Sequence, residues 1–182
     1  MQERDKFKTF VIRESIPEDI QGMLGVFNYY VENSFAAYLE TPVGPDFFQN
    51  FHDESRQNKN EQFPFYVIET NDKIAGIGTL RPYFPFLNFL HTGVLSYFIL
   101  PEYTRKGIGT KLLDTLCQDA RKKKMKSLLA NVSSRNEASL NFHLKNGFVE
   151  CGRFKDVGTK FGEYFDVVWL QKFLEEISKK RT

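Results

Sequence analysis

A glycine-rich, basic turn stands in the middle of the chain, between an apolar run and an amphipathic one. The segment reads Pro101-Glu-Tyr-Thr-Arg-Lys-Gly-Ile-Gly-Thr-Lys-Leu-Leu113. The first N–H groups of a helix lack partners within it, and with the helix dipole they form an anion site. Gly107 and Gly109 let a phosphate approach the backbone, and Arg105 and Lys106 add charge. The segment predicts a phosphate-binding turn; a plain helix start with glycine in a tight turn is the alternative.

The turn lacks the sequence features of two common nucleotide-binding sites, the P-loop and the dinucleotide-binding fingerprint. A P-loop needs Gly-Lys-Ser/Thr at the helix start, and this sequence is absent from the turn. A dinucleotide fingerprint needs a third glycine, where Leu112 stands. It also needs an acidic residue about 20 positions on, where the chain reads Lys126-Ser127-Leu128. We therefore expect the pyrophosphate of a different cofactor.

A second polar segment, from Asn131 to Phe148, places an amide and an imidazole on one helix. Asn136 begins the expected helix, and His143 follows seven residues later, two turns on and on the same face. The two side chains can therefore line one groove. An ordinary N-cap would also explain Asn136, and a satisfied buried or surface histidine would explain His143.

The composition excludes several classes of protein. The 182 residues, 41% apolar and 26% charged, suit one globular domain. A net charge of +2 is small for a nucleic-acid-binding domain, and no apolar run approaches the ~18 residues of a membrane span. The N-terminus has no signal segment, and Cys117 and Cys151 make no disulfide framework. We expect one cytoplasmic domain over residues 1–182, with no metal, nucleic acid or membrane.

Hydrophobic periodicity predicts an α/β protein whose elements follow the order β-α-α-β-β-β-α-β-α-β-β. Hairpins supply antiparallel pairs, and the strand-helix-strand units around Gly107 and Asn136 can supply a parallel pair. A loop over Asp156–Gly162 is expected to join the last two strands. The expected strands are residues 7–13, 65–69, 74–80, 93–100, 128–132, 148–154 and 164–170, and the expected helices are 17–33, 46–57, 107–123 and 136–146.

Four segments together resemble one family. Arg-Lys-Gly-Ile-Gly before a helix resembles the coenzyme A loop of the GNAT N-acetyltransferases, and Asn-x-x-Ala-Ser-x-x-x-His-x-x-x-Gly-Phe resembles their second motif. Residues 151–171 and Ser34–Pro42 are similar to the phosphinothricin and methionine sulfoximine N-acetyltransferase branch. The resemblance covers nearly the whole chain. It implies the GNAT fold, a mixed, mostly antiparallel sheet of about seven strands flanked by helices.

The resemblance also implies acetyl-coenzyme A (acetyl-CoA) as cosubstrate, a small-molecule amine as acceptor, and a homodimer. The pyrophosphate would lie on the backbone of Arg105, Lys106, Gly107, Ile108, Gly109 and Thr110. The pantetheine arm would pair with the edge of Tyr97, Phe98 and Ile99 like an added strand, and Asn136 would hydrogen-bond the cofactor. His143 is the candidate general acid for the departing thiolate. The acceptor would lie near Arg81, Pro82, Tyr83, Val94, Leu95 and Ser96, with Arg81 on its acidic end.

Two positions depart from the branch, and they keep alternatives open. Thr104 stands where the family has Arg or Gln, and Val94 where the branch has the glutamate that handles the acceptor ammonium. The general base is therefore unassigned; His91 is near in sequence, but an ordinary loop histidine is the favoured explanation for it. A non-catalytic acyl-CoA binder would lose such acid-base groups, and an acetyltransferase for a polyamine or a peptide or protein amine would need an open acidic groove. The resemblance implies an amino-acid-like acceptor of the phosphinothricin or methionine sulfoximine type. Val94 predicts poor activity on those two compounds themselves, and better activity on a less polar amine or on none.

Overall fold

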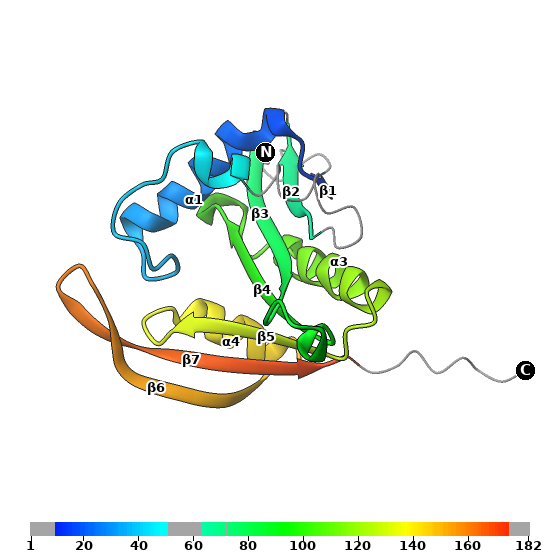
Figure 1. Cartoon of the computed structure of the whole chain (residues 1–182). Coiled ribbons are helices and arrows are strands. Elements are labelled where there is room, and N and C mark those ends of the chain that lie inside the picture. The colour runs from blue at the N-terminus through cyan, green and yellow to red at the C-terminus, as the bar shows by residue number, and fades with distance from the viewer. Residues whose placement is uncertain (1–9, 51–62, 72, 175–182) are drawn as a thin grey trace, which may run out of the picture.

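The computed structural model of the chain describes residues 10–50, 63–71 and 73–174, which form a seven-stranded sheet with helices on both faces (Figure 1). The strand order is β1-β2-β3-β4-β5-β7-β6. Neighbouring strands are antiparallel, except that β4 and β5 are parallel. The expected mixed, mostly antiparallel sheet is confirmed.

The helices and strands begin and end close to the positions that the hydrophobic patterns predict. The strands are β1 Phe10–Glu14, β2 Phe65–Thr70, β3 Lys73–Pro82, β4 Thr92–Ile99, β5 Ser127–Ser133, β6 Val149–Lys160 and β7 Glu163–Phe173. The helices are α1 Ile20–Asn33, α3 Ile108–Lys122 and α4 Glu137–Lys145. Another helix begins at Asp46 and runs to residue 50. The remainder of that expected helix, and residues 7–9 of the first expected strand, lie outside the described residues.

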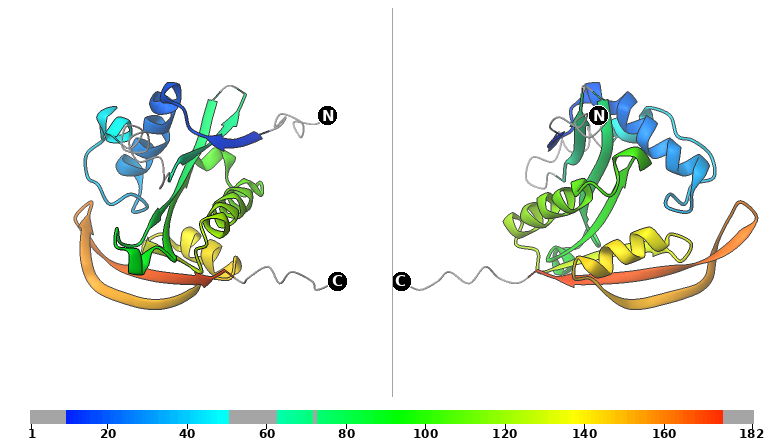
Figure 2. Two further views of the ribbon diagram at one scale, coloured as in Figure 1. Left: turned by 45° about the vertical axis from the view of Figure 1, so that its right-hand side comes forward. Right: turned by 180° about the vertical axis from the view of Figure 1, so that it is seen from behind.

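The sheet has a separate core on each face, because side chains alternate along a strand. On one face, Met23 of α1 packs with Val67 and Ile77 of β2 and β3. On the other face, the apolar stripe of α3, including Leu112 and Leu116, packs against residues of β3, β4 and β5. Figure 2 shows α1 and α3 on opposite sides of β3 and β4. The sheet therefore separates an α1 side from an α3 and α4 side.

The parallel strands β4 and β5 are paired over only three residues each. Their register runs from Thr92 opposite Ser127 to Val94 opposite Leu129. Beyond that point β4 stays with β3 and β5 stays with β7, and the two strands diverge (Figure 1). This separation opens a gap in the middle of the sheet, and the inner edges of the gap carry backbone hydrogen-bonding groups.

The last hairpin is longer than the sequence predicts. The loop expected over Asp156–Gly162 is wrong, because β6 continues to Lys160 and a two-residue turn, Phe161 and Gly162, leads into β7. Both turn residues have positive φ, 52° and 76°, which matches the right-handed twist of a hairpin. The polar, glycine-containing run that suggested a loop is a bulge, marked by a register shift between Phe154 and Gly158.

Candidate active site

The turn before α3 presents backbone N–H groups to the outside of the helix. Gly107 is the N-cap with a φ of 78°, a conformation that favours glycine. The first hydrogen bond of the helix runs from the N–H of Lys111 to the C=O of Gly107, at 3.2 Å. The N–H groups of residues 108–110 precede it and point out of the helix end. The predicted phosphate-binding turn therefore has the geometry of an anion site.

The basic residues of this turn are exposed, and Arg105 itself adopts a φ of 59°. Lys106 Nζ donates to the C=O of Glu102 at 2.6 Å, which holds the ammonium group beside the turn. Thr104, the departure from the family pattern, donates its hydroxyl to the C=O of Pro101 at 2.8 Å. Thr104 thus closes the turn, while Arg105 and Lys106 supply positive charge around it.

Only every second residue of β4 directs its backbone N–H and C=O groups into the gap between β4 and β5. The N–H of Leu100 donates to the C=O of Ala75 on the β3 side, at 2.9 Å. In an antiparallel pair every second residue bonds the partner strand, so the backbone of Phe98 also faces β3. The backbone of Tyr97, next to Phe98, points into the gap. Residue 97 is therefore best placed to pair with an extended ligand.

The other two residues expected along the pantetheine arm have different surroundings. The C=O of Ile99 accepts a hydrogen bond from the Tyr30 hydroxyl. The ring of Phe98 lies on the α1 side, edge-on to Phe27 at 5.2 Å between centroids. By the same alternation the backbone of Ile99 also faces the gap, but Tyr30 already occupies its C=O, whereas the Phe98 ring belongs to the wall on the α1 side.

His143 lies on α4 behind Tyr97 and is only 3% exposed. Its Nδ1 lies 2.8 Å from the C=O of Ser139, and its Nε2 lies 2.7 Å from the Tyr97 hydroxyl. Because a carbonyl only accepts, Nδ1 carries the proton, and Nε2 accepts the hydrogen of the Tyr97 hydroxyl. The two rings stack at 5.4 Å. Tyr97 and His143 form one hydrogen-bonded pair in which the Tyr97 oxygen is the outer atom.

Burial keeps both members of this pair neutral. Burial lowers the pKa of His143, although its hydrogen bond to Ser139 opposes the shift. Burial also raises the pKa of the Tyr97 phenol above its ordinary value. An imidazole that accepts at Nε2 cannot donate from that atom unless it first gains a proton. The expected role of His143 as general acid therefore depends on a proton that this arrangement does not favour.

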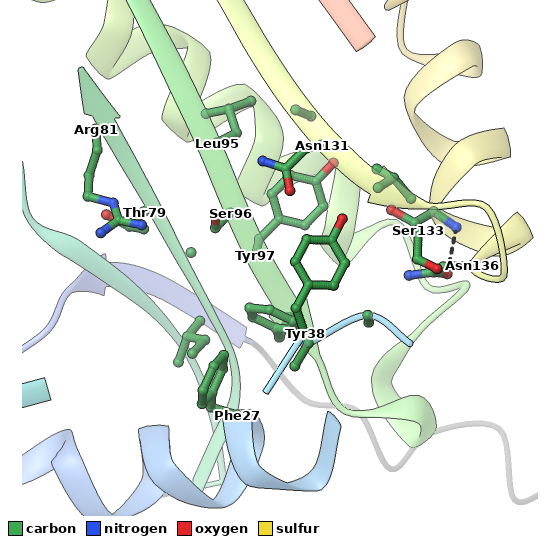
Figure 3. Close-up of a pocket in the computed structure, with 18 of the residues that line it drawn as sticks. Phe27, Tyr38, Thr79, Arg81, Leu95, Ser96, Tyr97, Asn131, Ser133 and Asn136 are labelled. Carbon is green, nitrogen blue, oxygen red and sulfur yellow. Dashed lines mark hydrogen bonds between the residues drawn. The ribbon is translucent and has the colours of Figure 1, made fainter. Parts of the chain in front are cut away.

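A pocket of about 360 Å³ connects the α1 side of the sheet with α4 through the gap (Figure 3). Its apolar wall includes Phe27 from α1 and Phe98 from β4, and its polar wall includes Thr79, Ser96 and Asn131. Asn136 and His143 lie at its α4 end. The Asn136 side chain accepts the N–H of Ser139 at 3.1 Å, so the expected cap exists and the same residue also lines the pocket.

The residues expected around the acceptor are only partly brought together. Arg81, Leu95 and Ser96 line the pocket, and Figure 3 shows the Arg81 guanidinium beside Thr79. Val94 is not among the described residues that line it, although it stands directly opposite Arg81 across the β3–β4 pair. Pro82 and Tyr83 also lie outside the lining set. The Tyr83 ring instead meets Phe84 and Trp169.

Sequence reasoning missed several residues of this wall. Asn131 and Ser133 on β5, Thr79 on β3 and Tyr38 from the loop after α1 all line the pocket. Polar residues at two alternate positions after the apolar run Leu-Leu-Ala of this strand were a usable signal for Asn131 and Ser133. No comparable signal marks Tyr38, because its place depends on a loop.

The loop that carries Tyr38 is held by the tip of the last hairpin. Lys160 of β6 is fully buried, and its Nζ donates to the C=O of Ser34 at 2.8 Å and of Ala37 at 2.6 Å. The Tyr38 ring stacks on Phe165 of β7 at 5.5 Å. Burial lowers the pKa of Lys160, and the two carbonyls supply hydrogen bonds to the ammonium. The hairpin thus fixes one wall of the pocket.

Metal-binding and membrane-spanning features do not accompany this pocket. Within residues 10–50, 63–71 and 73–174, no group of three or more His, Cys, Asp or Glu side chains is placed to hold a metal ion. In the described part of the chain, no helix combines the length and apolarity needed to cross a bilayer.

A helix end with the geometry of an anion site and a small pocket at a gap in the sheet fit a group-transfer enzyme with one phosphate-bearing and one small substrate. The sequence profile of the Acetyltransferase (GNAT) family matches residues 16–148, from the residue before the short 3-10 turn Pro17–Asp19 to the start of the last hairpin. The chain therefore belongs to the GNAT acetyltransferase family, and it is an acyltransferase. The family and the enzyme class expected from the sequence motifs are confirmed.

Relatives of the chain include proteins with the two names of the expected branch. The chain is 30% identical to an L-methionine sulfoximine/L-methionine sulfone acetyltransferase of Pseudomonas aeruginosa, over 90% of this chain and 94% of that one. It is 31% identical to a phosphinothricin N-acetyltransferase of Alcaligenes faecalis, over 85% and 78%. The L-amino acid N-acyltransferase MnaT of Escherichia coli is 35% identical over 63% of this chain and 66% of its own length.

Solved structures share the fold. A ribosomal-protein-alanine N-acetyltransferase of Brucella melitensis has a TM-score of 0.82 at 33% identity, covering 90% of this chain and 99% of that one. A Salmonella typhimurium protein, solved with its cofactor acetyl-CoA, has a TM-score of 0.83 at 25% identity, covering 96% and 99%. The same chain topology thus accommodates acetyl-CoA in a neighbour.

Proposed function

We propose that the chain transfers the acetyl group of acetyl-CoA to the primary amine of a small, amino-acid-like molecule. The observation that carries this proposal is the continuous pocket that runs from the Arg81 side of the sheet, through the gap between β4 and β5, to Asn136 and His143. A donor and an acceptor that enter from opposite sides of the sheet would meet in that gap. The named N-acetyltransferases among the relatives support the same reaction.

Acetyl-CoA would be held mainly by backbone groups. The N–H groups of residues 108–110 would bind the pyrophosphate, with Arg105 and Lys106 beside them. The backbone of Tyr97 would pair with the pantetheine arm, and the Asn136 amide would add a hydrogen bond. Backbone donors at a helix end suit phosphate because they are fixed in place and carry the positive end of the helix dipole.

The rate would come chiefly from placing the amine against the thioester in a site that excludes bulk water. The amine attacks the thioester carbon as the free base, and the carbonyl oxygen gains negative charge that a strand N–H can stabilise. The Tyr97 hydroxyl donates its hydrogen to Nε2 of His143, so it can protonate the leaving thiolate only after that hydrogen turns away from His143. We assign Tyr97 and His143 jointly to the leaving thiolate, with Tyr97 as the contacting group.

Two alternative functions can be distinguished from this one by experiment. A non-catalytic acyl-CoA binder is favoured by Val94 and by the occupied Nε2 of His143. An acetyltransferase for polyamines is disfavoured, because the described residues that line the pocket include no Asp or Glu to attract several ammonium groups. Continuous measurement of thiol release from acetyl-CoA, with and without amines, separates turnover from binding alone.

A homodimer in a reducing compartment, the cytoplasm, completes the proposal, with the whole chain as a single domain. Apolar side chains on the edge strand β6 support self-association, since Val149, Phe154 and Val157 are more than half exposed. Cys151 is an exposed free thiol, which suits a reducing environment. Sedimentation equilibrium tests the dimer, and cell fractionation tests the compartment.

A further inference from the structure

The last residue of β4 differs from the rest of the strand edge, because a side chain from α1 already bonds it. The backbone of Ile99 faces the gap, as does that of Tyr97. The C=O of Ile99 accepts the hydrogen of the Tyr30 hydroxyl, since a carbonyl cannot donate. After Ile99 the chain enters the short 3-10 turn Pro101–Tyr103, which leads to the turn before α3. The contact therefore lies where the strand edge meets the segment that leads to the anion site.

Tyr30 reaches this carbonyl from the last turn of α1, and that helix end is held in place. The N–H and the hydroxyl of Ser34 both donate to the C=O of Tyr30, each at 3.2 Å, and the helix ends there. The Tyr30 ring packs against the ring of Phe98 at 5.5 Å between centroids. A helix end and an aromatic contact thus aim the hydroxyl, and its position does not depend on a loop.

The Tyr30 hydroxyl keeps its proton at neutral pH. Burial is the main cause that raises the pKa of Tyr30 to about 12, with further contributions from Tyr29 and Glu102. Only the neutral phenol can donate a hydrogen bond to a carbonyl, so the bond to Ile99 is available over the whole range in which the enzyme would work.

A carbonyl at the gap needs a partner once a ligand covers it. A ligand that lies along the edge of β4 removes water from Ile99, and a covered carbonyl without a hydrogen bond is unfavourable. A pantetheine arm carries few donors, and the C=O of Tyr97 would use one of them. A bond from Tyr30 that is formed beforehand removes this requirement and fixes the edge before the ligand arrives. Such preorganisation raises affinity because less order remains to be imposed on binding.

We propose that Tyr30 is a positioning residue for acetyl-CoA; this inference rests on the proposed acetyltransferase function. Its hydroxyl satisfies the C=O of Ile99, so that the pantetheine arm is left with the C=O of Tyr97 as acceptor and the N–H groups of Tyr97 and Ile99 as donors. The arm then places its carbonyl groups against those N–H groups and an amide N–H against Tyr97. Tyr30 thereby limits how the arm can pair with β4, without touching the reacting atoms.

The test measures the dissociation constants of two ligands by calorimetry. Coenzyme A carries the pantetheine arm, and its phosphoadenosine diphosphate fragment keeps the pyrophosphate but lacks the arm. Tyr30→Phe removes the hydroxyl and keeps the ring that packs on Phe98. We expect this variant to raise Kd for coenzyme A about tenfold, the effect of one hydrogen bond, and to leave Kd for the fragment within about twofold of the parent value.

Tyr29→Phe is the matched control, because Tyr29 precedes Tyr30 on α1 and is 38% exposed. It removes the same group from the same helical turn and leaves the bond to Ile99 in place. Both dissociation constants should stay at their parent values. Neither tyrosine is among the described residues that line the pocket, so neither variant alters the acceptor wall directly.

A structure of the unaltered protein with coenzyme A bound tests the inference without any variant. The Tyr30 hydroxyl should remain within hydrogen-bonding distance of the C=O of Ile99, and an N–H of the arm should bond the C=O of Tyr97. An arm that displaces Tyr30 and bonds the C=O of Ile99 itself would overturn the inference, even if Tyr30→Phe failed to fold.

The binding data can also contradict the inference in two ways. An unchanged or lower Kd for coenzyme A in Tyr30→Phe would show that the hydroxyl does not help the arm to bind. An equal rise in Kd for coenzyme A and for the fragment would show that Tyr30 only supports the fold around the turn. The acetyltransferase proposal would survive both results, whereas a parent protein that binds no coenzyme A would reject the inference and the proposed function together.

Discussion

The cofactor and acceptor ends of the proposed site are made from different kinds of structure. At the cofactor end, the edge of β4 presents the backbone of residue 97 to the pocket, and the turn at residues 107–110, which lies outside the lining residues, presents further N–H groups. At the α1 end, side chains come from α1, the loop after it, β3, β4 and β5. Backbone groups bind a cofactor in the same way whatever the neighbouring side chains are. Side chains can be substituted one at a time, so substitutions at the α1 end can change the acceptor specificity without changing cofactor binding.

The largest expected effect is on the backbone end. Gly107→Val places a β-branched residue at a φ of 78°, a conformation that such residues rarely adopt. The turn should rearrange and the phosphate site should be lost. In the parent, acetyl-CoA at 100 times its dissociation constant should stabilise the fold by about 2.7 kcal/mol. Thermal unfolding with and without acetyl-CoA should show this stabilisation in the parent and none in Gly107→Val.

Gly25→Val is the matched control for that variant. Gly25 lies in α1, and a Cβ there has no neighbouring atom within 4 Å, as at Gly107. The control therefore adds the same side chain without the positive φ, and it should keep the response to acetyl-CoA. A full response in Gly107→Val would show that the cofactor binds elsewhere.

This contrast also explains which parts of the molecule the sequence could predict. The turn at Gly107 and the cap at Asn136 are local motifs, so neighbouring residues determine their geometry and the sequence prediction matches the structure. The strands other than β6 follow local hydrophobic patterns in the same way. The end of β6 was missed because a bulge and a turn both use glycine and polar residues, and only pairing with β7 distinguishes them.

The pocket wall on the acceptor side was harder to predict from the sequence, because it depends on contacts between distant segments. Lys160 fixes the loop of Tyr38 across 123 positions of sequence, through its bond to Ala37. Periodicity within a strand predicts which face a residue occupies, so Val94, Ser96 and Phe98 share one face of β4. It does not predict which residues on that face border a cavity, and Val94 is the example.

The second prediction concerns the clamp on the acceptor wall. Lys160→Met removes the ammonium that bonds the C=O groups of Ser34 and Ala37, leaving both acceptors without this donor. Stability should fall by about 1–3 kcal/mol, and KM for the acceptor should rise because the Tyr38 loop loosens. The acetyl-CoA dissociation constant should change little, since the backbone end is untouched.

Lys155→Met serves as the control for the clamp, because the Lys155 side chain is 75% exposed and pairs with Asp166 at the surface. It should alter neither stability nor KM by much. If Lys160→Met raised the acetyl-CoA dissociation constant as strongly as the acceptor KM, the two ends would not be independent.

The third prediction uses the His143 pKa, which burial lowers. Below the unfolded-state pKa of about 6.5, the His143 imidazole binds a proton in the unfolded chain but not in the folded chain. The free energy of unfolding therefore falls as the pH decreases. The slope contributed by this group is at most about 1.4 kcal/mol per pH unit. His143→Gln should flatten the loss of unfolding free energy between about pH 7 and 5.5, measured by denaturant titration.

The smallest effect is expected at Val94, which faces Arg81 across the strands and borders the acceptor end without lining the pocket. Val94→Glu adds the carboxylate that the family resemblance leads us to expect at this position, and an opposite charge both attracts an ammonium and helps to take its proton. Turnover of methionine sulfoximine should rise a few-fold relative to L-phenylalanine, provided that Arg81 still binds the substrate. The measurement is the ratio of kcat/KM values for the two amino acids, in the variant and in the parent.

Val94→Gln is the control for this substitution, because it has nearly the same size as Val94→Glu without the charge, so it should leave the ratio unchanged. Directly opposed residues in a strand pair interact, so the introduced carboxylate can instead pair with Arg81. In that case KM would rise for both amino acids, while KM for 2-phenylethylamine, which has no carboxylate, would not change. Residue 94 would then act on the charge of Arg81 and not on the amine of the substrate. Equal ratios in Val94→Glu and Val94→Gln would show that charge at residue 94 has no part in choosing the acceptor.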